Sequence, residues 1–348
     1  VCSSDLFKIN AFAGITYEVD YETMCDRQGF RDYDILIFDP RYNQLNRYNQ
    51  RIDGTRWNGA FPASYLFTRH ADFDLRRYTF AYHIFLRCYE QFNAVAHFPT
   101  GRQVIRLYPG GGFVDEKSLR IVDPDTHVIA THPHTIATLK SVGHPHVFEC
   151  LGGSFISRDM PLFEPKPLKL GKLTVCFASM GHAEEKGADH FRHIADEYHR
   201  LFPGHDVRFI AIGNTAFSKP IERVAPMPMH ELMDFYRQEV DIMVSIDTAK
   251  AFNGWPLGVE AALNGAVLIT TDIANANQHY GFPNESLFIF DLNQRSAVVE
   301  FIHEMNVDRR QLMARSQFCQ RAFLTFYAYE AQQGRIFKYL DALFNATL

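Results

Sequence analysis

Short, almost uninterrupted apolar runs alternate with helical patterns through the second half of the chain, and this alternation limits the possible folds more than any other feature. Strands are expected over 173–178, 207–212, 241–246, 266–270 and 287–290, with a short one at 224–226. Helices are expected over 187–201, 230–238, 256–263 and most of 295–344, the first with Phe191, Ile194, Ala195 and Tyr198 on one face. Strands that are apolar throughout are typical of parallel sheets covered on both faces. The pattern therefore predicts a Rossmann-like α/β domain.

The first half carries strands of the same kind, separated by longer polar and aromatic stretches. They are expected at 35–38, 104–107, 128–130 and 147–149, while 80–92 has the apolar spacing of a helix. A segment rich in proline and lysine, 161–172, is typical of a linker. We expect an N-terminal Rossmann-like domain over 7–165, a C-terminal one over 171–325, and a C-terminal helix, 326–348, that crosses back to the first domain. Residues 1–6 resemble a translated sequencing adaptor, so natural residues are expected to be missing before Phe7.

Composition excludes several broad classes of protein. A chain of 348 residues with 47% hydrophobic residues is long enough for two cores. Its 35 basic residues against 40 acidic ones give a net charge of -5, which predicts no nucleic-acid partner. The six cysteines are scattered without a CxxC pair, which favours a reduced, cytoplasmic protein. No apolar run approaches the ~18 residues of a membrane span.

Two turns at expected carboxyl ends of strands carry the chemistry, because ligands of open α/β sheets bind at that edge. The first turn, 179–187, contains Ser179, Gly181, His182 and Lys186 just before a helix. Backbone N–H groups at a helix start, together with a lysine, suit a diphosphate. The alternative is a surface turn whose lysine is only solvated.

The second turn, 251–265, follows the strand over 241–246 and runs into a short helix. Its glycine-rich start lets a ligand approach the backbone, and Glu260 can accept hydrogen bonds from two ribose hydroxyls. The alternative is that Gly254 and Pro256 only shape the helix start.

Together the two turns resemble the C-terminal domain of GT-B glycosyltransferases, most closely the retaining family 4. The matching segments are Glu185-Lys186-Gly187 and Trp255-Pro256-Leu257-Gly258-Val259-Glu260-Ala261, followed by Gly265 and the strand over 267–270. The resemblance spans about 173–290. It implies the GT-B fold, two Rossmann-like domains facing each other across a cleft, and transfer of a sugar from a nucleotide-diphosphate-sugar donor.

The resemblance also implies roles for individual residues. Lys186 would neutralise the donor diphosphate without a metal, Glu260 would bind the ribose, and the backbone around Asn253 would face the donor sugar. The full donor-binding set implied is Ser179, Gly181, His182, Gly213, Asn214, Met227, Asn253, Gly254, Trp255, Pro256 and Leu257. The nucleotide sugar is a substrate, and no cofactor is expected. The acceptor would be a glycan, a lipid-linked or a small molecule, in the cytoplasm or in peripheral contact with the inner membrane face.

Two departures from the family pattern keep other functions open. Phe252 stands eight positions before Glu260, where the family usually has a second glutamate, and the arginine expected before Lys186 is absent. One alternative is a nucleotide-sugar epimerase on the same fold. Another is a catalytically degenerate nucleotide-sugar-binding module.

Histidine pairs form the remaining motif. His132-Pro133-His134 and His144-Pro145-His146 are two HxH pairs, which can ligate zinc. We expect instead that His132 or His134 lies near the acceptor as a catalytic group, because the first pair follows a strand. Ordinary helix capping at this point is the alternative.

Overall fold

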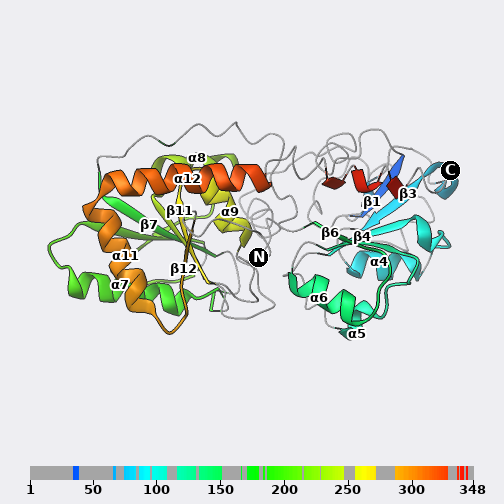
Figure 1. Ribbon diagram of the computed structural model, residues 1–348, viewed down its shortest axis with the longest axis horizontal. Coiled ribbons are helices and arrows are strands. Elements are labelled where there is room, and N and C mark those ends of the chain that lie inside the picture. The colour runs from blue at the N-terminus through cyan, green and yellow to red at the C-terminus, as the bar shows by residue number, and fades with distance from the viewer. Residues whose placement is uncertain are drawn as a thin grey trace. The chain divides into compact units, whose positions relative to one another are not determined.

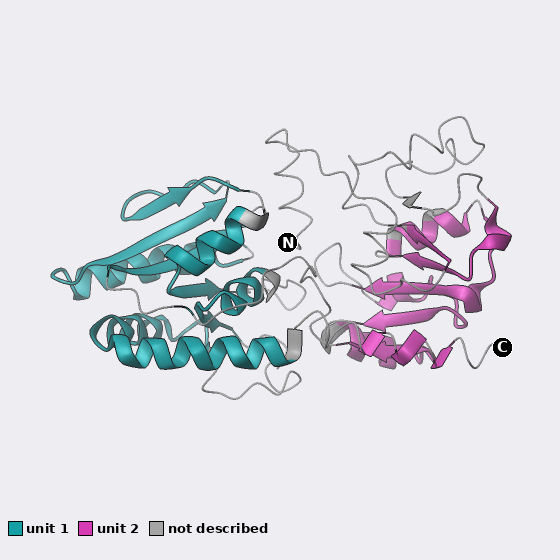
Figure 2. Cartoon of the chain, turned by 90° about the horizontal axis from the view of Figure 1, so that it is seen from above, with its two compact units in different colours: residues 1–9, 159–328 teal, residues 10–158, 329–348 magenta. Residues whose placement is uncertain are grey.

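Two β-sheets, each within its own unit of the chain, form the frame of the computed structural model (Figure 1). Unit 1 comprises 1–9 and 159–328, and unit 2 comprises 10–158 and 329–348 (Figure 2). The structure describes residues 34–38, 66–67, 74–83, 86–94, 96–107, 116–130, 133–150, 166, 171–179, 183–184, 186–213, 215–227, 229–246, 255–271, 287–327, 335–336, 338–340 and 342–343.

The six-stranded sheet of unit 1 is parallel in every pairing. Its strands are β7 (Leu173–Ser179), β8 (Val207–Gly213), β9 (Ile221–Val224), β10 (Ile242–Ser245), β11 (Val267–Thr270) and β12 (Leu287–Ile289). They lie in the order β12-β11-β10-β7-β8-β9. Numbered from β7, this is the 3-2-1-4-5-6 order of dinucleotide-binding folds, read from the other edge.

Helices cover both faces of that sheet because its strands are apolar on both sides. The helices are α7 (Ala188–Leu201), α8 (Met229–Glu239), α9 (Trp255–Leu263), α11 (Arg295–Val307) and α12 (Arg309–Tyr327). α7 packs on α11 at one face, while α9 packs on α8 and α12 at the other (Figure 1). The predicted face of α7 is confirmed, since Phe191, Ile194, Ala195 and Tyr198 are all buried.

The sheet of unit 2 has the order β2-β1-β3-β4-β5-β6, with β2 antiparallel to β1 and the other pairs parallel. Its strands are β1 (Ile35–Phe38), β2 (Leu66–Phe67), β3 (Phe80–His83), β4 (Gln103–Leu107), β5 (His127–Ala130) and β6 (Val147–Glu149). Its helices are α4 (Leu86–Asn93), α5 (Glu116–Leu119) and α6 (Pro133–Ser141), with short 3-10 turns η3 (Leu75–Arg77) and η4 (Thr100–Arg102).

The end of the chain packs on this second sheet. The Tyr339 ring stacks on Phe148 of β6 at 4.3 Å between centroids, and its hydroxyl lies 2.9 Å from Nδ1 of His127 in β5. Ile336 and Leu340 beside it are buried. Residues 329–348 therefore belong structurally to unit 2, although they follow the whole of unit 1 in the sequence.

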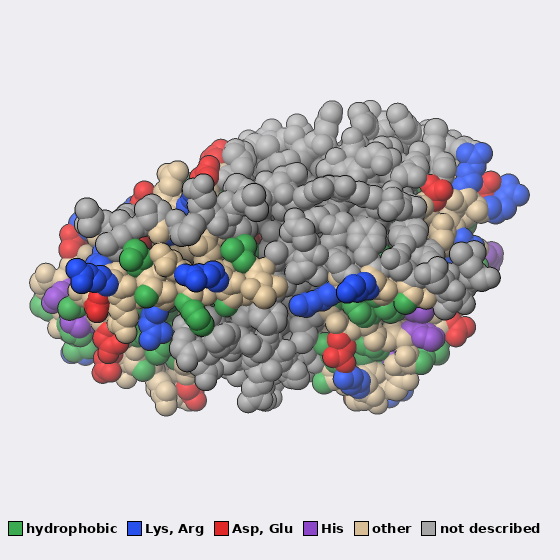
Figure 3. Space-filling view, turned by 45° about the horizontal axis from the view of Figure 1, so that its top comes forward, with side chains coloured by type: hydrophobic (Ala, Val, Ile, Leu, Met, Phe, Trp, Pro, Cys, Tyr) green, Lys and Arg blue, Asp and Glu red, His purple; other side chains and the backbone are tan. Residues whose placement is uncertain are grey.

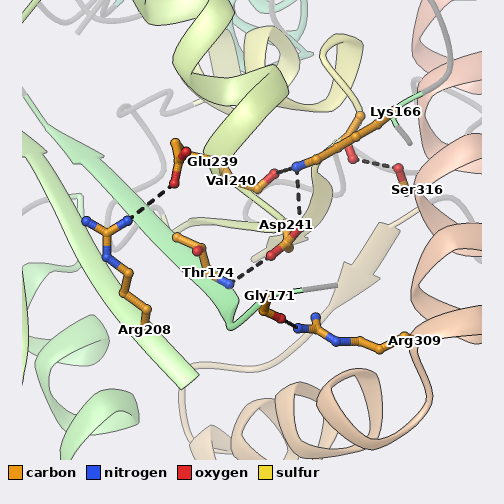
Figure 4. A network of polar contacts seen from close by, with 10 residues as sticks. Lys166, Gly171, Thr174, Arg208, Glu239, Val240, Asp241, Arg309 and Ser316 are labelled. Carbon is orange, nitrogen blue, oxygen red and sulfur yellow. Dashed lines mark hydrogen bonds and ion pairs between the residues drawn. The ribbon is translucent and has the colours of Figure 1, made fainter. Parts of the chain in front are cut away.

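A buried polar network closes the amino-terminal edge of the sheet of unit 1 (Figure 4). The ammonium of Lys166 donates to the Val240 carbonyl and lies 3.4 Å from the Asp241 carboxylate. That carboxylate also accepts a 2.9 Å hydrogen bond from the Thr174 backbone N–H. Gly265 lies against the Lys166 stem, and its carbonyl accepts a 2.6 Å hydrogen bond from Ser316. The segment that enters unit 1 is therefore fixed at Lys166.

Two predicted elements are wrong in detail. The helical pattern over 80–92 contains β3 and then α4, because a short run of aromatic and small apolar residues fits a buried strand as well as a helix turn. The short strand expected at 224–226 is β9, which begins at Ile221. The buried Ile221 pairs with Phe209, whereas Pro226 has no N–H to donate to a sheet.

The described surface carries both signs of charge. Figure 3 shows Lys and Arg side chains interspersed with Asp and Glu over the visible face of unit 1, in keeping with the net charge of -5. Within the described helices, none combines the length and apolar character needed to cross a membrane.

Candidate functional site

The two central strands of unit 1 create the most favourable place for a ligand. β7 and β10 are neighbours, but the chain leaves β7 toward β8 and leaves β10 toward β11 on the other side. α7 and α9, which make these connections, consequently lie on opposite faces of the sheet (Figure 1). Open α/β sheets bind ligands at the carboxyl ends of strands that diverge in this way.

Lys186 lies in the turn between β7 and α7. The Gly187 N–H donates to the Glu184 carbonyl at 2.9 Å, and the Ala188 N–H donates to the Ala183 carbonyl at 2.9 Å. These bonds fold the chain back over the strand end, and the Lys186 side chain is 2% exposed. The turn therefore holds a lysine inside the protein at the start of a helix of 14 residues.

Gly187 brings this turn against the end of β10. Its φ of +79° lies in the left-handed region, which favours glycine. A Cβ at this position would lie 2.6 Å from Cγ2 of Ile246, the residue just after β10. Only a glycine allows this approach, and so the turn after β7 touches the chain that leaves β10.

Glu260 lies on α9, in its second turn, and is 1% exposed. A Cβ at Gly258 would lie 2.9 Å from Leu268 of β11 and 3.3 Å from Ser245 of β10, so α9 sits close on both strands. On its other side, the Asn264 amide donates to the Glu260 carbonyl and contacts Sδ of Met233 in α8. These contacts fix the backbone that carries Glu260.

Among the residues that the structure describes, no hydrogen-bond donor stabilises a negative charge on the buried Glu260 carboxyl. Within the described residues, neither of its oxygens has a hydrogen-bond partner. Burial raises the pKa of Glu260 from 4.5 to about 8, and the positive charge of Lys186 acts against this shift. Lys186 and Glu260, 74 positions apart in the sequence, are thus brought into electrostatic contact.

A buried lysine and a buried carboxyl at one sheet edge can do two things. The lysine and the N–H groups at the start of α7 can hold an anionic group. A carboxyl without internal donors can accept hydrogen bonds from ligand hydroxyls, since buried polar groups otherwise remain unsatisfied at a cost of about 1–3 kcal/mol. The pair therefore fits a ligand that has an anionic part and a hydroxyl-bearing part.

Other predicted donor-site residues lie on the same edge. Ser179 ends β7 and is buried, and it is in register with Gly213, which ends β8 with a φ of +134°. Leu257 is buried in α9, and Met227 is half-buried between β9 and α8. Gly181, His182, Asn214, Asn253 and Gly254 lie outside the described residues, and for Trp255 and Pro256 only the backbone, at the start of α9, is described.

The predicted acceptor-side histidines belong to unit 2. His134 is part of α6, with its side chain outside the described part, and His132 lies outside it altogether. In the second HxH pair, the His146 N–H donates to Nδ1 of His144 at 3.3 Å, and the His146 ring lies 4.8 Å from that of His127. Within the residues that the structure describes, no three His, Cys, Asp or Glu side chains form a metal-binding group.

Sequence reasoning missed two residues of this site. Tyr236 of α8 is fully buried, and burial raises the pKa of its hydroxyl, with smaller contributions from Cys176 and Glu260, so the hydroxyl belongs to the same buried polar region. Ile246 is the contact for Gly187. Neither residue belongs to a recognisable sequence motif, because a tyrosine on an amphipathic helix and an isoleucine at a strand end are ordinary core residues.

Comparison with known proteins identifies the fold. No protein-family model matches the sequence, and no curated protein matches it. Solved structures do match. Sucrose-phosphate synthase from Thermosynechococcus elongatus is similar with a TM-score of 0.59 and 14% identity, over 77% of this chain and 74% of that one. HepE from Anabaena, solved with UDP-glucose, is similar with a TM-score of 0.59 and 15% identity, over 76% and 79%.

A third match is longer than this chain. The pneumococcal O-GlcNAc transferase GtfA, solved with UDP and GlcNAc, is similar with a TM-score of 0.54 and 15% identity, over 76% of this chain and 57% of that one. At such identities the likeness concerns the fold. The chain has the GT-B fold found in retaining glycosyltransferases, and the resemblance inferred from the two turns is confirmed at that level.

Proposed function

We propose that this protein is a glycosyltransferase that takes its sugar from a UDP-sugar donor bound to unit 1. The observation that carries the proposal is the buried pair of Lys186 and Glu260 at the diverging strands β7 and β10. Similar structures support the choice of nucleotide, since HepE was solved with UDP-glucose and GtfA with UDP and GlcNAc.

In this proposal each end of the nucleotide meets one of the two buried groups. The diphosphate lies at Lys186 and the first N–H groups of α7, where the charge and the helix dipole both favour an anion. The ribose lies at Glu260, whose two oxygens can accept one hydrogen bond from each hydroxyl of the diol. Ser179, Gly213 and Leu257 line the same edge, and Met227 lies toward the base.

The reaction then follows from charge. The bond between the anomeric carbon of the sugar and the diphosphate oxygen breaks, and UDP leaves with the electron pair. Lys186 stabilises the negative charge that develops on the leaving group, so this scheme needs no metal. The acceptor hydroxyl forms the new bond to the anomeric carbon and gives its proton to a base, for which we propose His132 or His134 of unit 2. By analogy with similar proteins we propose that the anomeric configuration is retained.

We further propose that the protein acts in the cytoplasm, on a glycan, lipid-linked or small-molecule acceptor. Cys88, Cys150, Cys176 and Cys319, the cysteines that the structure describes, are buried thiols outside any disulfide. Thiols are kept in this state by a reducing compartment.

The test is nucleotide binding and sugar transfer by the full chain and two variants. Isothermal titration with UDP should give saturable binding, weakened about tenfold or more in Lys186→Met, since a charge-assisted hydrogen bond contributes about 1.5–3 kcal/mol. Glu260→Gln should also weaken binding. Lys172→Met and Glu304→Gln change the same residue types at exposed positions and should leave binding unchanged.

The outcomes separate the alternatives. UDP-sugar consumption that requires an acceptor supports the transferase. Conversion of the donor sugar without an acceptor would instead indicate an epimerase. Binding without turnover across donor and acceptor panels would indicate a degenerate binding module, the function favoured by Phe252. A folded chain that binds no nucleoside diphosphate would refute the proposal.

A further inference from the structure

The surroundings of Glu260 make its ionisation unfavourable when the site is empty. The carboxyl is 1% exposed, and within the described residues both of its oxygens lack a hydrogen-bond partner. Its neighbours along α9 are apolar and buried: Leu257, Val259, Ala261, Ala262 and Leu263. An ionised carboxylate in such a place loses its hydration and gains no donor in return.

The ionisable groups around Glu260 do not reverse this preference. Lys186, before α7, is the cation whose charge favours the carboxylate, and burial outweighs it. Tyr236 on α8, Cys176 on β7 and Cys319 on α12 are buried groups with raised pKa, so all three are neutral near pH 7. The described parts of β10 and β11 carry only Ser245 and Thr270 as polar residues on the strands themselves.

We propose that Glu260 is protonated in the empty site and ionised when it binds the ribose diol, so that nucleotide binding releases a proton from this carboxyl to the solvent. The proposal rests on the proposed function, and it adds a proton to the binding equilibrium. The O–H bond of the carboxylic acid breaks, its electron pair stays on the carboxylate, and the buffer takes the proton. Two ribose hydroxyls then donate to the two carboxylate oxygens and replace the missing donors.

The direction of the pH dependence follows. Below a pKa of about 8, the empty site must lose a proton before it can bind the diol in this form. Affinity therefore rises with pH, by about tenfold from pH 6 to pH 7, and levels off above pH 8. At pH 7 about 0.9 proton should leave Glu260 for each nucleotide bound.

Calorimetry of the full chain in buffers with different heats of ionisation measures this proton. UDP should release about 0.9 proton more at pH 7 with the wild-type protein than with Glu260→Gln. Protons released from the UDP phosphates contribute equally to both proteins, so they cancel when the two numbers of released protons are subtracted. Glu304→Gln, the same change at an exposed position on α11, should behave as wild type. Inorganic pyrophosphate and 2′,3′-dideoxyUDP, which lack the diol, should release no proton from Glu260.

The result that overturns the proposal is saturable UDP binding with equal proton release in wild type and Glu260→Gln. The proposed function would then stand without this linkage. A folded wild-type chain that binds no UDP would refute both. A second measurement needs no variant: the infrared difference spectrum on adding UDP should lose the C=O band of one protonated carboxyl. A spectrum that keeps this band while UDP is bound also overturns the proposal.

Discussion

At the scale of single residues, unit 2 carries a buried histidine that couples folding to pH. His83, at the end of β3, is fully buried, and its Nε2 lies 2.9 Å from Oε1 of Gln103. The Gln103 amide in turn donates to Asn93 at 2.9 Å, and the His83 ring packs edge-on against Tyr89. Burial lowers the pKa of His83 to about 3, and the hydrogen bond to Gln103 opposes this shift only in part.

This residue predicts a loss of stability on mild acidification. The unfolded chain takes up a proton on His83 below pH 6.5, and the folded chain does not until about pH 3. Stability is therefore complete above pH 6.5 and falls as the pH decreases, by about 2 kcal/mol between pH 7.5 and pH 5. Guanidinium unfolding of unit 2 at the two pH values should show a loss of at least this size, because burial also lowers the pKa of His127 in the same unit to about 4. His83→Gln should reduce the loss by about 2 kcal/mol. His97→Gln, at an exposed histidine, should leave the pH-dependent loss of stability unchanged. An unchanged pH dependence in His83→Gln would contradict the assignment.

The residues of the candidate site were predictable from the sequence only in part. Lys186 and Glu260 could be selected because each follows an apolar strand at a defined distance, and strand ends of parallel sheets carry ligands. The burial of these two side chains could not be predicted from the sequence, since exposure depends on which loops and helices pack around a turn. Tyr236 and Ile246 join the site through tertiary packing alone, and no spacing in the sequence indicates that.

At the scale of elements, a single glycine determines how the turn after β7 meets β10. Gly187 has a left-handed backbone and lies against Ile246, with Lys186 directly before it. A side chain at this position would have to move either the turn or the end of β10. Either movement would shift Lys186 from the sheet edge.

Gly187→Ala should therefore affect both stability and ligand binding. The left-handed conformation costs about 1–2 kcal/mol for alanine, and the contact with Ile246 adds about 1–3 kcal/mol of overpacking. Chemical unfolding and UDP titration should both show the loss, and Ile246→Ala in the same chain should restore part of it. Gly204→Ala is the matched control, because nothing lies within 4 Å of a Cβ there. Wild-type binding by Gly187→Ala would contradict this account of the turn.

The elements themselves were predicted well where the pattern was long and less well where it was short. α7 has 14 residues and one buried stripe, so its helical period was unambiguous. The run Phe80–His83 has only four residues, all buried, and such a run fits a strand or a helix turn equally. Pairing with β1 and β4 decides in favour of a strand, and pairing partners cannot be read from local sequence.

At the scale of the whole molecule, the chain passes between the units three times, after residues 9, 158 and 328. The second passage is followed by the buried anchor Lys166, and the third by the half-buried anchor Tyr339. Lys166 holds the segment that enters unit 1, and Tyr339 holds the segment that returns to unit 2. Each anchor makes its contacts inside one unit. Loss of one anchor should consequently destabilise one unit and leave the other unchanged.

Lys166→Met tests the first anchor. It leaves the buried Asp241 carboxylate without its cation, and removal of one partner from a buried ion pair costs about 3–5 kcal/mol. Lys172, which pairs with Asp206 at 2.8 Å on the surface, is the matched control, since Lys172→Met should cost no more than about 1 kcal/mol. Calorimetric unfolding should show a lower transition for unit 1 alone, and a shift of both units would contradict separate anchoring.

Tyr339 tests the second anchor in the opposite unit. Tyr339→Ala removes the stack on Phe148 and the hydrogen bond to His127, and should lower the unfolding free energy of unit 2 by about 3 kcal/mol. Tyr339→Phe keeps the stack and should cost about 1 kcal/mol, the value of one hydrogen bond. Phe318→Ala, at an exposed aromatic residue of α12, should change neither transition by more than about 0.5 kcal/mol.

Because the tail follows unit 1 in the sequence, unit 2 gains this part of its stability only after all of unit 1 has been synthesised. Proteolysis of a chain ending at Tyr327 should then cut unit 2 faster than unit 1, and equal cleavage rates would show that the tail is not needed.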